Sequence, residues 1–109
     1  MWDLRETISL VEEAKERAKK LRGSIIAVYR TTSIVIGKLE EVKIEKLWST
    51  QVPFCRLRLK KVKKFDLEGR LIGESEEDFV YVNKKEFIFS LEELEKANKK
   101  VYKSFLNVI

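Results

Sequence analysis

The chain has 109 residues, which is enough for one domain and too few for two ordinary ones. Lys and Arg number 23 against 18 Asp and Glu, so the formal net charge is +5, and apolar residues make up 44% of the chain. This composition suits a folded core rather than a disordered segment. Histidine is absent and cysteine occurs once, which excludes imidazole catalysis, histidine metal sites and an internal disulfide. We therefore expect one small basic domain over residues 1–109, with no enzyme activity and no cofactor.

The cellular location of the protein is predicted from its single cysteine and from the lack of signal-peptide and membrane-spanning patterns. A single cysteine is typical of a reducing compartment. Charges are spread throughout residues 1–22, unlike a signal peptide, and no uncharged stretch approaches the ~20 residues that span a bilayer. We expect a cytoplasmic protein without a membrane span. Charged residues reach 38%, mostly Lys and Glu, a bias found in hyperthermophile proteins, so we also expect a thermophilic protein.

The first predicted element is a helix over residues 3–22. Apolar residues recur at intervals of three and four from Leu4 to Leu21, which makes one apolar stripe. Asp3 followed by Glu6 is a variant of the capping box, and Gly23 is a typical residue for the end of a helix.

From Ser24 to Phe89 the pattern changes to short runs of β-forming residues. Gly37, inside the second run, predicts a bend, and a slip in the alternation at Lys60–Val62 predicts a bulge. We interpret residues 74–78 as an acidic loop and residues 83–85 as the tip of a hairpin. The predicted strands are 25–29, 34–48, 54–65, 70–73, 79–82 and 86–89.

The last predicted element is a helix over residues 91–107. Ser90 and Glu93 stand at the positions of a capping box, which marks its start. The predicted fold class is therefore α+β: a small, strongly bent antiparallel sheet or barrel of five to six strands, between an N-terminal and a C-terminal helix. An open sheet covered by the two helices is the alternative arrangement.

Two features that could carry chemistry are better explained by structure. Cys55 alternates in phase with Leu57 and Leu59, so we expect a core residue rather than a nucleophile, which would need an adjacent base. The acids at 74–78 lack the spacing of a calcium loop, so we expect a solvated turn and no metal site.

The most unusual segment is a run of cations without an acid among them. Alternation places the first three on one strand face, about 7 Å apart, close to the phosphate spacing of an extended single strand. Two further lysines stand at the predicted hairpin tip, and three aromatic residues are candidate stacking surfaces: Trp48, Phe54 and Tyr81. The sequence therefore predicts a non-catalytic module that binds RNA or single strands. The candidate nucleic-acid-binding residues are Arg56, Arg58, Lys60, Lys61, Lys63, Lys64, Lys84 and Lys85.

Two alternatives stay open. The cations of the third strand could instead form cross-strand ion pairs with Glu40, Glu41 and Glu45. The function could instead be protein interaction or assembly, through sheet edges and an apolar C-terminus that contacts a partner or a second copy of the chain. The residues of that C-terminus are Phe105, Leu106, Val108 and Ile109.

The segment from Ile25 to Leu91 resembles the Sm-like family of small SH3-like barrels. Residues 34–39 (Ile-Val-Ile-Gly-Lys-Leu) are similar to the second strand of that family, in which a glycine permits a sharp bend, and residues 79–89 are similar to its closing hairpin. The resemblance implies a bent five-stranded barrel and RNA binding. The family's Asp- and Asn-containing loop after the second strand has no match around residues 46–51, so its uridine site is not carried over.

Overall fold

The computed structural model describes residues 4–47 and 52–109. Helix α1 (Leu4–Leu21) opens the described chain, which confirms the predicted N-terminal helix, and the Asp3 cap lies outside the described residues. The apolar stripe faces the sheet, with Val11, Ala14 and Ala18 buried. In these ranges no helix is both long and apolar enough to cross a membrane.

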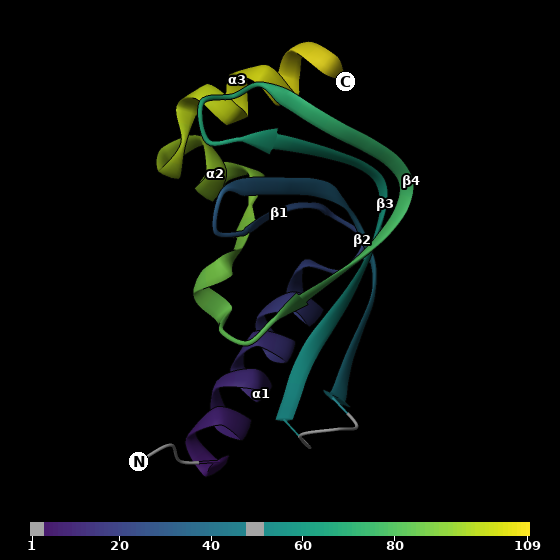
Figure 1. Ribbon diagram of the computed structural model, residues 1–109, viewed down its shortest axis with the longest axis vertical. Helices are drawn as coiled ribbons and strands as arrows, with labels where there is room; N and C mark the ends of the chain where they lie inside the picture. The colour runs from purple at the N-terminus through teal and green to yellow at the C-terminus, as the bar shows by residue number, and fades with distance from the viewer. Residues whose placement is uncertain (1–3, 48–51) are drawn as a thin grey trace.

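Five antiparallel strands form one sheet in the order β4-β3-β2-β1-β5, and Figure 1 shows the long strands curving between α1 at one end of the molecule and α3 at the other. Strands β4 and β5 are the edges of the described sheet, so this sheet is open rather than a closed barrel. The α+β class and the bent antiparallel sheet are confirmed. The strands are β1 (Ile25–Tyr29), β2 (Ser33–Leu47), β3 (Val52–Asp66), β4 (Leu71–Val82) and β5 (Ile88–Ser90).

The bend occurs where β2 passes a bulge in β3. A Cβ atom on Gly37 would lie 3.0 Å from the Lys60 carbonyl oxygen and 3.1 Å from Leu59 Cβ, so only glycine fits without a shift. Opposite, Lys61 has a φ of 53°, and the β2–β3 ladder changes register next to Gly37. The predicted bend and bulge are both confirmed.

Strand β4 is longer than predicted. It runs without a break through the residues expected to form an acidic loop, because its ladder with β3 sets Glu74 opposite Lys63 and Glu77 opposite Lys60. Opposite charges across a ladder stabilise the extended conformation. The predicted loop at 74–78 is therefore wrong.

The predicted hairpin around residues 83–85 is also wrong. The 3₁₀ turn η1 (Lys85–Phe87) leads from β4 to β5, and β5 pairs with β1 rather than with β4. Strands β4 and β5 are therefore the two opposite edges of the sheet, and the loop between β1 and β2 lines hollows together with residues of β4.

The bent sheet has apolar residues on both faces. One cluster lies under α1 and contains Leu57 and Val80, and the other lies under the C-terminal helices and contains Phe65 and Phe105. Along β1 and the start of β2, successive residues alternate between the two clusters. At β1 and the start of β2 the sheet therefore lies between α1 on one face and the C-terminal helices on the other. Farther along β3 and β4, the described residues cover only the face toward α1, and the opposite, outer face is open.

The C-terminus forms two helices, α2 (Leu91–Ala97) and α3 (Lys99–Val108), instead of the predicted single helix over 91–107. Asn98 interrupts them with φ −153° and ψ 92°: its carbonyl side-chain oxygen accepts from Val101 N–H at 3.1 Å, and its amide donates to the Leu67 carbonyl at 3.0 Å. An asparagine side chain competes with the helix backbone in this way. The capping box that Ser90 forms with N3 is confirmed.

Candidate nucleic-acid interface

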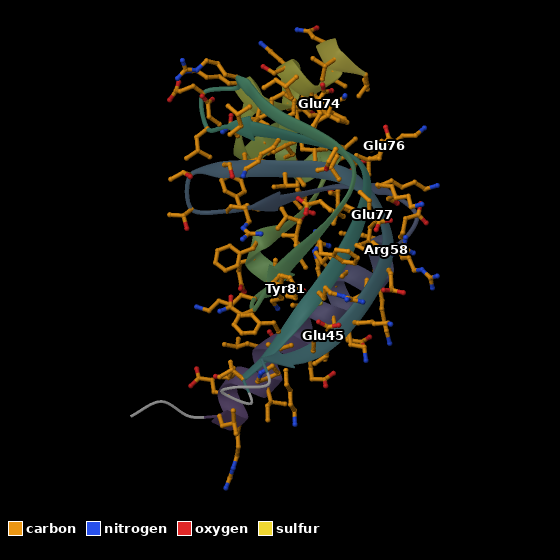
Figure 2. All side chains as sticks on the ribbon, turned by 45° about the vertical axis from the view of Figure 1, so that its right-hand side comes forward. Glu45, Arg58, Glu74, Glu76, Glu77 and Tyr81 are labelled. Carbon is orange, nitrogen blue, oxygen red and sulfur yellow. The ribbon has the colours of Figure 1, made fainter. Side chains whose placement is uncertain are left out.

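The alternation predicted for β3 is present. Cys55, Leu57 and Leu59 are buried in the core, so Arg56 and Arg58 lie on the opposite, outer face of the sheet. Cross-strand pairing places the same face of β4 beside them, with Tyr81 opposite Arg56 and Phe79 opposite Arg58. Figure 2 shows Arg58 beside Glu77 on this face, with Tyr81 farther along β4.

Acidic neighbours neutralise both arginines. The Arg56 guanidinium lies 3.1 Å from the carboxylate of Glu41 and 3.0 Å from that of Glu45, and the Arg58 guanidinium lies 3.3 Å from the Glu77 carboxylate. For Arg56 the alternative left open by the sequence, a cross-strand ion pair with Glu41 and Glu45, describes the structure. Arg58 is paired across strands too, but with Glu77 of β4, which that alternative did not name. Glu40 instead faces Lys38, at 3.8 Å.

Arg56 is mainly a structural residue. Its side chain is only 20% exposed, and its guanidinium carbon lies 4.8 Å from the centre of the Phe79 ring, a cation–π contact. Its Nε is buried and has no partner among the described residues. Arg56 therefore joins β2, β3 and β4 across the outer face, and little of its charge reaches solvent.

The remaining six predicted cations divide into two groups. Lys63 lies 2.5 Å from the Glu74 carboxylate, and Lys85 lies 3.7 Å from that of Glu13 on α1. The other four are exposed and make no ion pair with any residue in 4–47 or 52–109. These four are Lys60, Lys61, Lys64 and Lys84.

After the bulge, the alternation of β3 divides the basic run between the two faces of the sheet. Lys61 and Lys63 line a hollow of about 810 Å³ next to the end of α3. Lys64 lines a different hollow of about 420 Å³, together with Arg30 from the loop between β1 and β2. The structure thus does not present the run as one continuous line of charge.

A third hollow, of about 600 Å³, lies between the end of β4, η1 and the loop after β1, and it is rich in aromatic rings. Phe54 and Tyr81, both predicted as stacking residues, line it, and Tyr81 is 44% exposed. Trp48, the third predicted stacking residue, lies outside the described residues. The remaining rings are Tyr29, Phe87 and Phe89, which the sequence analysis did not single out.

The rings of Tyr29 and Phe89 lie 5.1 Å apart and are tilted by 56°. They form two walls at an angle rather than one flat surface. Phe87, on η1, is 39% exposed. We name this cavity, with its five rings, the aromatic hollow.

The aromatic hollow and the 420 Å³ hollow share Arg30 and Thr31. Arg30 is exposed and makes no ion pair with any residue that the structure describes. It was missed in the sequence because a single arginine in a turn has no distinguishing pattern. Arg30 therefore lies at both hollows, whereas Lys64 lines only the 420 Å³ hollow, together with Asp78 and the exposed ring of Phe79.

The single cysteine is not exposed as a nucleophile in this structure. Cys55 is buried, and burial raises the pKa of its thiol to about 11, which leaves almost no thiolate at neutral pH. Among residues 4–47 and 52–109, no three Cys, Asp or Glu side chains gather as a metal would require. The described surface does present unpaired cations beside aromatic rings.

No protein-family model matches the chain, and no curated protein matches it. The Sm-like resemblance therefore stays a prediction.

Proposed function

We propose that this protein is a non-catalytic module that binds RNA or other single-stranded nucleic acid. The observation that carries the proposal is that Arg30 lines the aromatic hollow with its five rings, and also lines, with Lys64 and Asp78, the 420 Å³ hollow that adjoins it. Neither Arg30 nor Lys64 makes an ion pair with a residue that the structure describes. Cations that track phosphates and rings on which bases stack are the two components of single-strand binding sites.

The ion pairs revise which cations contribute. A lysine already paired with a carboxylate releases few counterions, so Arg56, Arg58, Lys63 and Lys85 contribute less than the sequence analysis expected. The phosphate contacts fall to Lys60, Lys61, Lys64, Lys84 and Arg30. If three to five of them contact phosphates, log Kobs falls with log salt at a slope of about −2 to −3.5.

A single strand suits this surface better than a duplex. Aromatic stacking requires bases whose faces are free, and in a duplex those faces are covered by neighbouring base pairs. We expect little sequence discrimination from the phosphate contacts themselves.

Fluorescence anisotropy with a labelled oligouridylate of about twelve nucleotides tests the proposal. We expect binding at ~50 mM salt that weakens steeply towards ~200 mM, and weaker binding of a duplex of the same length. The proposal fails if the strand does not bind at ~50 mM salt, or if its affinity is independent of salt.

One observation favours assembly as a second candidate function. The end of α3 exposes apolar side chains, with Val108 39% and Ile109 69% exposed, and both line the 810 Å³ hollow beside the edge strand β4. Ile72, on the same strand, is 54% exposed. Removal of residues 106–109 tests this candidate and spares the buried Phe105. An oligomer that persists at high salt and dissociates on truncation would favour assembly, whereas a monomer at all concentrations would exclude self-association.

A further inference from the structure

The aromatic hollow contains polar groups that the fold does not use. Asn83, just after β4, and Glu86, on η1, both line the hollow and are exposed. Neither side chain makes a hydrogen bond or ion pair with any residue in the described ranges. The lysine next to Glu86 does not neutralise it, because the Lys85 ammonium faces Glu13 on α1.

The aromatic hollow is lined by five rings and by the unpaired carboxylate of Glu86. This combination suits a planar ligand that presents hydrogen-bond donors at its edge. Ligand sites are typically hollows of ~300–1,000 Å³ with apolar walls and a few polar groups that fix orientation. At about 600 Å³ the aromatic hollow is large enough for one base with its sugar. An ionised carboxylate only accepts hydrogen bonds, so Glu86 selects for a ligand edge that donates.

Among the nucleobases, guanine fits this requirement best. Its Watson–Crick edge carries two adjacent donors, the N1–H and the N2 amino group, which a carboxylate can accept together. Adenine and cytosine each present one amino donor on that edge. Uracil presents a single N–H between two carbonyl oxygens, and these acceptors repel the oxygens of a carboxylate.

We propose that the aromatic hollow binds one unpaired guanine of a single strand, with Glu86 accepting hydrogen bonds from its Watson–Crick edge. This inference rests on the proposed function, because Arg30 and Lys64 in the adjoining hollow would hold the phosphates of the same strand. The site therefore adds base selection to an otherwise sequence-independent contact.

An alkylammonium ion is the competing ligand, because aromatic rings with a carboxylate also attract cations. The structure favours the base, since Arg30 lines the same hollow and its positive charge opposes a cationic ligand. Arg30 instead favours a ligand that carries a phosphate.

The test compares two strands of about nine nucleotides, one all uridine and one with a single central guanosine. We expect the guanosine strand to bind about tenfold more tightly to the wild-type protein. Glu86→Gln removes the carboxylate and should abolish this preference without changing the salt dependence. Glu92→Gln, the same change at an exposed glutamate on α2 that does not line the hollow, should leave the preference intact.

A second measurement keeps the two proposals separable. Guanosine monophosphate, uridine monophosphate and tetramethylammonium are each titrated into isotope-labelled protein, and NMR shifts are followed at Tyr81 and Phe87. Shifts with guanosine monophosphate alone support the inference even if longer strands fail to bind. Equal, salt-dependent binding of both strands overturns the guanine site but leaves the proposed function standing. Shifts with tetramethylammonium, or with none of the three probes, also overturn the guanine site.

Discussion

Replacing Lys64 with glutamine should weaken strand binding, because Lys64 is exposed, makes no ion pair with described residues and lies beside Arg30. If its ammonium contacts one phosphate, the slope of log Kobs against log salt becomes less steep by about 0.7. At ~0.1 M salt the same contact contributes about 0.7 log units of affinity, so Lys64→Gln should weaken binding about fivefold.

Lys20→Gln is the matched control. Lys20 is exposed on α1, makes no ion pair with the described residues, and its replacement lowers the net charge by the same unit. If the position of the charge matters, this control should change the affinity by less than about twofold.

Anisotropy titrations of both variants with the same oligouridylate, over a series of salt concentrations, give the affinity and the slope. Equal losses in the two variants would mean that net charge alone attracts the strand, and the placement of cations derived from the structure would be refuted. A Lys64→Gln slope identical to that of the wild type would refute the phosphate contact.

Three further predictions concern the fold. Gly69 has a φ of 92°, and an added Cβ would lie 2.8 Å from Ser104 Oγ. Gly69→Ala should therefore destabilise the protein by about 2 kcal/mol and lower its Tm by ~10 °C in a thermal melt. An unchanged Tm would contradict this packing. Burial raises the pKa of Cys55 to about 11, so a thiol reagent at about pH 8 should leave Cys55 unmodified in the folded protein and modify it in denaturant. Rapid modification of Cys55 in the native state would show that the thiol is accessible. The Ser90 backbone N–H donates to the Glu93 carboxylate at 2.9 Å and is the main cause of the lowered pKa of Glu93. The ionised carboxylate therefore stabilises the fold at pH values above its ordinary pKa of 4.5, and this stabilisation is lost as the pH falls further. The difference in unfolding free energy between wild type and Glu93→Gln, measured with denaturant, should narrow in acid, and a constant difference would be inconsistent with the capping role.

The elements predicted correctly are those whose signals are local in the sequence. The α1 stripe and the capping box at Ser90 each depend on residues within a few positions of one another. The bend was indicated by Gly37 itself, although the atoms that leave no room for a Cβ there belong to β3. Strand β4 could not be predicted in this way, because its acids form a strand only in register with Lys60 and Lys63 of β3. The break between α2 and α3 likewise depends on a contact of Asn98 with the distant β3–β4 turn.

The candidate site also has features that local sequence signals predict and features that depend on distant contacts. Alternation in β3 predicts that Arg56 and Arg58 share a face, but pairing with acids on neighbouring strands depends on register, which the chain does not reveal locally. After the bulge, successive residues of β3 face opposite sides of the sheet, so Lys63 and Lys64 lie at different hollows. The aromatic hollow combines residues from β1, β3, β4, η1 and β5, and only the bend of the sheet brings them together.

NMR mapping of the surface that a single strand contacts would show whether the strand binds at the aromatic hollow and the hollow that adjoins it. Isotope-labelled protein is titrated at ~50 mM salt with an unlabelled oligouridylate of about twelve nucleotides. We expect shifts that cluster at Arg30, Lys64 and Tyr81. Shifts confined to residues 106–109, or no shifts at all, would contradict this expectation.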